Sequence, residues 1–152
     1  MSESTSIAAP AAGLLRRLGA MVYDALLVIA ILMVATVLFL PFTGGEAVSL
    51  EVAGPVLFYF YRVWLVVLIV GFFGLFWTRR GQTLGMAAWR LRLVRDDGRK
   101  FTWADALKRL AAACLSWLPV GLGFLWMLVD DNRLAWHDRL THTRVVLEPK
   151  QK

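Results

Sequence analysis

The most constraining feature of the sequence is an apolar stretch that runs from Leu18 to Leu40 and ends at Pro41, with Asp24 inside it. An α-helix of about 20 apolar residues is long enough to cross the hydrocarbon core of a bilayer. A carboxylate at the centre of such a helix costs about 3 kcal/mol on insertion scales. The stretch therefore predicts a membrane-spanning helix in which Asp24 faces protein or water.

Two further apolar blocks follow, at residues 56–77 and 110–129. The third block is interrupted by Pro119, Gly121 and Gly123, so it is either one kinked span or a broken, re-entrant pair of short helices. The chain is 59% hydrophobic, whereas soluble domains average roughly 45–50%. We therefore expect an all-α membrane protein with spans near 18–40, 56–77 and 110–129. Residues 1–15 are expected to be a flexible segment, residues 16–147 the membrane domain and residues 148–152 a short tail.

The distribution of charge predicts the orientation in the membrane. The loop at 42–55 has two glutamates and no basic residue, whereas the loop at 78–109 has nine Lys and Arg. The positive-inside rule places the N-terminus and the second loop in the cytoplasm. It also accounts for the net charge of +6, so no nucleic-acid partner is expected. The basic residues of the tail and the Pro-Gly break favour a third block that turns back, so the C-terminus is expected in the cytoplasm; a single third span would put it outside.

The second loop is expected to be structured. Alternation from Trp89 to Val94, followed by Asp97-Gly98, predicts a short cytoplasmic β-hairpin. Thr102 with Asp105 predicts a capped helix start. A second β-prone segment, TRVVLEP from Thr143, would pair with the hairpin if the tail is cytoplasmic.

Arg17 and Asp24 are seven residues apart, so they share a helix face. Their backbones are about 10 Å apart along the axis, from a rise of about 1.5 Å per residue, so a water or another helix is needed to link them. Two interpretations of Asp24 stay open: a carboxylate in a wet crevice near the interface, or a buried acid that exchanges a proton or binds a cation. Arg62 is expected to snorkel outward.

The C-terminal segment contains His137, Asp138, Arg139 and His142. No nucleophile motif accompanies the His–Asp pair, and the spacing does not match a metal site. We expect no enzyme activity, no metal and no cofactor. A single cysteine, Cys114, excludes an internal disulfide, and its expected role is that of a small buried residue.

The chain resembles the RDD family of small bacterial membrane proteins, which is named for one arginine and two aspartates. RRLGAMVYDALL supplies Arg17 and Asp24 in the family's arrangement, GQTLGMAAWRLRLVRDDGR resembles its glycine–threonine–glycine loop and following strand, and LAWHDRLTHTRVV resembles its histidine–aspartate motif. The resemblance covers about residues 13–147. Two positions depart from it: Met86 replaces a frequent lysine, and Thr141-His142-Thr143 replaces Ala-Gly-Thr.

The resemblance implies a multi-pass protein of the bacterial inner membrane that transports an unidentified ligand, a cation or protons. Arg17 would keep Asp24 ionised, and Asp138 would approach from the cytoplasmic tail to complete a buried polar site. The alternative is a structural clasp of these three residues that fixes the fold or holds a partner subunit. Expected partners are the lipid bilayer and either a second copy of the chain or another membrane protein. The residues expected to support the site are Gly81, Thr83, Gly85 and His137.

Overall fold

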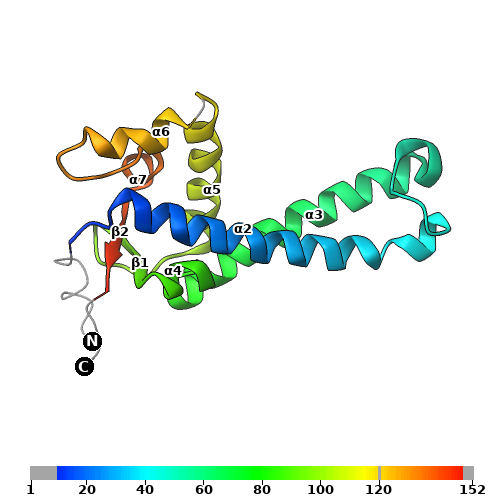
Figure 1. Ribbon diagram of the computed structural model, residues 1–152, viewed down its shortest axis with the longest axis horizontal. Helices are drawn as coiled ribbons and strands as arrows, with labels where there is room; N and C mark the ends of the chain where they lie inside the picture. The colour runs from blue at the N-terminus through cyan, green and yellow to red at the C-terminus, as the bar shows by residue number, and fades with distance from the viewer. Residues whose placement is uncertain (1–9, 120, 149–152) are drawn as a thin grey trace. The chain divides into compact units, whose positions relative to one another are not determined.

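The computed structural model describes residues 10–119 and 121–148. The chain forms two compact units. The split unit joins the chain up to Asp24 with the chain from Phe73 onward, and the continuous unit is Ala25–Phe72. Most described residues are helical, and Figure 1 labels the elements. The elements are α2 (Leu14–Val37), η1 (Leu40–Thr43), α3 (Leu50–Arg80), α4 (Leu84–Ala88), β1 (Leu91–Arg95), α5 (Trp103–Trp117), α6 (Leu122–Leu125), η2 (Trp126–Leu128), α7 (Trp136–Leu140) and β2 (Thr143–Leu147).

Among the described residues, helices α2 and α3 are each long and apolar enough to cross a membrane. Helix α2 covers most of the predicted span 18–40, and helix α3 contains the predicted span 56–77. The first helix begins earlier than predicted and ends at Val37, and the second extends from Leu50 to Arg80. Helix α3 is kinked at Gly54, which has a φ of 69°, directly before Pro55. Glycine adopts this left-handed backbone without the steric penalty that other residues have.

The third apolar block is broken, as one of the two predicted alternatives requires. Helix α5 begins at Trp103, seven residues before the predicted start of the block, and its axis makes an angle of 104° with the segment Leu122–Leu128. Gly121 supports the break with a φ of 78°. At the start of α5, the predicted capping box is confirmed, because Thr102 and Asp105 bond to each other's backbone N–H groups.

The two strands pair antiparallel, with Leu93 opposite Val145, and lie side by side in Figure 1. The predicted local hairpin around Asp97-Gly98 is wrong in its partner, because the second strand is β2, from the C-terminal segment. Pairing with β2 buries Leu93 and Val145 in one core cluster, whereas Arg99 and Lys100, which directly follow Gly98, are exposed. The segment Thr143–Leu147 therefore pairs with β1, in line with the prediction that this part of the chain could add to the hairpin.

The N-terminal segment adds to this edge. Ala11 forms a bridge with Val146, and Ala12 N–H donates to Val145 O at 2.9 Å. This part of the segment predicted to be flexible is therefore held against β2, while residues 1–9 lie outside the described residues. Glu148 of the predicted tail pairs with Arg92.

The continuous unit is built from apolar and aromatic contacts. Phe39 packs edge-on against Tyr61, with ring centroids 5.1 Å apart. The Tyr61 hydroxyl lies 2.8 Å from the Thr36 hydroxyl. Arg62 is exposed, and its guanidinium lies over the Phe58 ring.

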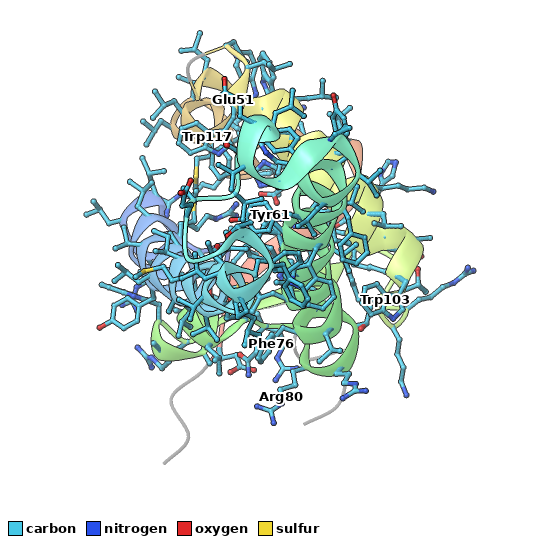
Figure 2. The ribbon with its side chains drawn as sticks, turned by 90° about the vertical axis from the view of Figure 1, so that its right-hand side faces the viewer. Glu51, Tyr61, Phe76, Arg80, Trp103 and Trp117 are labelled. Carbon is cyan, nitrogen blue, oxygen red and sulfur yellow. The ribbon has the colours of Figure 1, made fainter. Side chains whose placement is uncertain are left out.

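Basic residues mark the other end of α3. Arg79 and Arg80 lie in its last turn, and both are exposed. Figure 2 shows the Arg80 side chain pointing away from the ribbon. Positive side chains are favourable at a helix C-terminus, because the last carbonyls carry partial negative charge.

Candidate functional site

A buried ionic cluster in the split unit centres on Asp138. Arg17 Nη1 donates to one carboxylate oxygen at 2.5 Å, and Arg109 Nη2 donates to the other at 2.6 Å. The backbone N–H of Ala135 adds a third donor at 3.2 Å. Asp138 is fully buried, and both arginines are 5% exposed. Because charged hydrogen bonds satisfy both oxygens, the carboxylate remains ionised despite its burial.

Arg17 also binds three backbone oxygens. Its Nε donates to Ala12 O, and its Nη2 donates to Arg133 O and Val145 O. These acceptors lie before α2, before α7 and in β2. One side chain at the start of the first span therefore holds three segments that are far apart in the sequence.

The pKa values of Asp138 and His137 are both lowered, but burial acts in opposite directions on the two groups. Burial opposes ionisation of Asp138, but Arg109 and Arg17 outweigh it and lower the pKa of this carboxyl below its usual range. Burial, reinforced by the positive charge of Arg109, lowers the pKa of His137 from 6.5 to about 3. His137 is therefore neutral at pH 7, with Nδ1 lying 3.4 Å from the Ser116 hydroxyl.

Arg109 was missed in the sequence, where it counts only as one of nine basic loop residues. The signal that marks it is its position on a helix face, because the buried residues of α5 recur three to four residues apart: Ala106, Arg109, Ala112 and Ser116. An arginine within such a stripe of small residues faces the interior and needs a buried partner.

Asp24 has different partners from those predicted. The Thr83 hydroxyl donates to one of its oxygens at 2.5 Å, and the Gly85 N–H donates to the other at 2.9 Å. The ion pair of Arg17 is with Asp138, in keeping with the expectation that Arg17 and Asp24 are too far apart along the helix for a direct salt bridge. Seven residues of helix separate the two side chains by about 10 Å, and Asp138 lies within direct reach.

The predicted glycine–threonine–glycine loop supports Asp24. Thr83 caps α4 by accepting a hydrogen bond from Met86 N–H at 3.2 Å. A Cβ atom at Gly85 would lie 2.8 Å from Asp24 Cγ, so only glycine allows this close approach. Gly81 has a φ of 67°, and its carbonyl accepts a hydrogen bond from Leu93 N–H at 2.7 Å. The loop is thereby fixed between Asp24 and β1.

A cavity of about 500 Å³ lies in the same unit. Its polar lining includes Arg17, Asp24, Thr83, Arg109 and His137. Its remaining walls are mainly apolar and aromatic. The largest of these side chains are Phe73, Trp77, Trp117 and Phe124. This volume lies within the usual range for small-molecule sites, about 300–1,000 Å³.

Trp77 is the unusual member of this lining. It is 8% exposed, and its Nε1 is buried without a hydrogen-bond partner in the described part of the chain. The Arg109 guanidinium carbon lies 5.7 Å from the centre of its ring. Buried donors are nearly always paired, so an unpaired indole N–H beside a cavity requires an explanation.

Among residues 10–119 and 121–148, no group of three or more His, Cys, Asp or Glu side chains is placed to hold a metal ion. Cys114 lines the cavity wall but is exposed, contrary to the expectation of a buried residue.

The two departures from the RDD pattern have structural consequences. Met86 is buried in the core of the split unit, where a lysine would have to place its charge. His142 has a φ of 50°, a left-handed backbone that glycine adopts more easily.

No curated protein and no solved structure matches the chain. The model of the RDD family matches residues 11–142, which include Arg17, Asp24, Arg109 and Asp138. With this match over most of its length, the chain belongs to the RDD family.

Proposed function

We propose that this RDD protein lies in the bacterial inner membrane and moves a small ligand, a cation or protons through the cavity beside Asp24. The cavity carries the proposal, because it places a buried carboxylate and two buried arginines in one space within the split unit. Ionisable side chains are rare within membrane spans and typically mark ion or substrate pathways. Asp24 is the side chain to which we assign the transport step.

Charge placement supports a cytoplasmic position for both termini and for the β1–β2 sheet. The connection between α2 and α3, residues 38–49, carries Glu46 and no basic residue, while arginines flank the opposite ends of both helices. By the positive-inside rule, these opposite ends face the cytoplasm. Asp138 contacts Arg17, and β2 pairs with β1, which follows Arg80 closely.

A second function is favoured by the hydrogen bonds that both carboxylate oxygens of Asp138 accept. Its two oxygens are occupied by Arg17 and Arg109, which leaves it poorly suited to release or exchange an ion. We propose that Arg17, Asp138 and Arg109 form a clasp that stabilises the fold or holds a partner subunit. Because the chain offers few spans, a transport path through it would be completed by a second copy of the chain or another membrane protein.

The test is flux in liposomes that contain the full-length protein. Proton flux is followed with an entrapped pH-sensitive dye, and sodium uptake with radioactive Na⁺. Asp24→Asn is expected to accumulate like the wild type and to abolish the flux, because the amide retains the shape but not the charge. Asp138→Asn is expected to lower the amount of folded protein instead.

Asp96→Asn is the matched control, because Asp96 forms an exposed ion pair with Arg144. It should change neither flux nor accumulation. A flux through Asp24→Asn as large as that through the wild type would refute the role of Asp24. Loss of the Asp24→Asn protein from the membrane would favour a purely structural role for Asp24, as for Arg17 and Asp138.

A further inference from the structure

The cavity has two charged regions of opposite sign. One is the arginine pole, formed by Arg17, Arg109 and Asp138, in which two guanidinium groups share one carboxylate. The other is the carboxylate pole, formed by Asp24. With all four groups ionised, the arginine pole has one surplus positive charge, and the carboxylate pole has one negative charge.

Within the arginine pole, Arg109 has a donor that its bonds to Thr143 and Asp138 do not use. Arg17 uses its three nitrogens on Asp138 and on backbone oxygens. Arg109 binds Thr143 and Asp138 through Nη1 and Nη2, and neither bond uses its Nε–H. The unpaired indole N–H of Trp77 belongs to the ring beside this guanidinium. The Nε–H of Arg109 and the indole N–H of Trp77 are therefore two donors beside one surplus positive charge. Such a pair is suited to bind an oxyanion.

The carboxylate pole is suited to a donor with positive charge. Each oxygen of Asp24 accepts one hydrogen bond, from Thr83 or from Gly85. A carboxylate oxygen has about two lone-pair sites, so each retains one acceptor position. Across the described ranges 10–119 and 121–148, no cationic side chain forms an ion pair with Asp24.

The walls between these poles are apolar. Phe73, Leu110, Ala113 and Phe124 contribute to them. A ligand with a single charge would pair with one pole and leave the charge of the other pole buried and uncompensated, which is unfavourable. We infer that the cavity binds a small zwitterion with an apolar body, the chemistry of an amino acid with an apolar side chain. Its carboxylate would face Arg109 and Trp77, and its ammonium group would face Asp24.

This inference rests on the proposed function, since it names the ligand class of the same cavity. The test uses three probes that share one phenyl body. Phenylalanine carries both charges, 3-phenylpropionate lacks the ammonium group, and 2-phenylethylamine lacks the carboxylate. Binding to the full-length protein in lipid nanodiscs is measured by calorimetry, and the heat from empty nanodiscs is subtracted.

Phenylalanine is expected to bind at least about tenfold more tightly than either singly charged probe, since each loses one charged contact. Equal affinity for the three probes, preference for a singly charged probe, or no saturable binding of phenylalanine would overturn the inference. The comparison uses wild-type protein, so it does not depend on whether a variant folds.

Two variants locate the binding groups. Asp24→Asn is expected to remove the preference for phenylalanine over 3-phenylpropionate, because the ammonium partner is lost. Trp77→Phe keeps an aromatic ring but removes the indole N–H, and it should weaken binding of phenylalanine and 3-phenylpropionate several-fold without affecting 2-phenylethylamine. Trp64→Phe, in the continuous unit and outside the lining of the cavity, is the matched control and should change neither the affinities nor the order of the three probes. An unchanged order in Asp24→Asn would overturn the assignment of the carboxylate pole.

The outcomes separate this inference from the transport proposal. Asp24-dependent flux of protons or sodium without phenylalanine binding would refute the ligand class and retain transport. Phenylalanine binding with the expected order and no flux would retain the binding site and refute transport of those ions.

Discussion

The two compact units differ in what holds their side chains in place. The continuous unit leaves large apolar side chains exposed, with Val56 at 84% and Val37 at 59%. The split unit buries four charged side chains, Arg17, Asp24, Arg109 and Asp138. Apolar side chains on a spanning helix are stabilised by lipid almost regardless of their neighbours, whereas a buried charge requires a specific partner. The continuous unit should therefore tolerate substitution, and the split unit should not.

The largest difference is expected at Asp138. Asp138→Asn leaves two buried guanidinium groups without their shared anion, and breaking a buried pair costs about 3–5 kcal/mol. The free energy of unfolding and the amount of protein in the membrane should both fall. Thermal unfolding in detergent, followed by tryptophan fluorescence, measures the first quantity.

Asp96→Asn provides the comparison within the same unit. Its ion pair with Arg144 is partly exposed on both sides, and exposed pairs contribute about 0–1 kcal/mol. Equal destabilisation by the two substitutions would show that the buried cluster has no special role in stability.

A pair of glycine substitutions compares the two units directly. Gly85→Ala places a methyl group against Asp24, and it should destabilise the protein by about 1–3 kcal/mol through overpacking. Gly71→Ala, in the continuous unit, meets no atom within 4 Å. It should change the stability by no more than about 1 kcal/mol, in the stabilising direction, because alanine favours helix. Chemical denaturation of both variants measures the contrast, and a similar loss in both would contradict it.

Lowering the pH should destabilise the split unit through protonation of His137 in the unfolded chain. The unfolded chain takes up a proton at this histidine below pH 6.5, whereas the folded protein does so only near its pKa of about 3. The free energy of unfolding should therefore decrease as the pH falls from 6.5 towards 3, by about 2 kcal/mol between pH 6.5 and 5. Asp138 adds a further loss below the usual carboxyl pKa, because its own pKa is lowered in the fold.

Thermal unfolding across this pH range measures the slope. His137→Gln should flatten it, since glutamine does not take up the proton. An unchanged slope in this variant would assign the acid sensitivity to other groups.

A small effect is also expected in the continuous unit, at Tyr61. Tyr61→Phe removes the hydroxyl contact to Thr36 and keeps the ring packed against Phe39. One neutral hydrogen bond contributes about 1 kcal/mol, so the melting temperature should fall slightly. A loss as large as that of Asp138→Asn would show that polar contacts control both units.

Much of the site was recognisable in the sequence. An aspartate within an apolar run, a glycine–threonine–glycine loop and a His–Asp pair identified Asp24, Thr83, Gly85 and Asp138. The resemblance also implied that Asp138 approaches Arg17, but the hydrogen bond between Asp24 and Thr83, which joins residues 59 positions apart, was not recognisable. Arg109 was overlooked because the positive-inside rule explains any basic residue at the end of a span equally well.

The sequence by itself determined the two long apolar helices and the capped start of α5, because hydropathy and capping depend on neighbouring residues. It left the third block as either one kinked span or a broken pair. The tertiary structure alone decided that β1 pairs with β2, that Asp138 takes both Arg17 and Arg109, and that Asp24 is left to Thr83 and Gly85. Those choices depend on which buried charges and strand edges come within hydrogen-bond reach of each other, and local sequence patterns do not encode that distance.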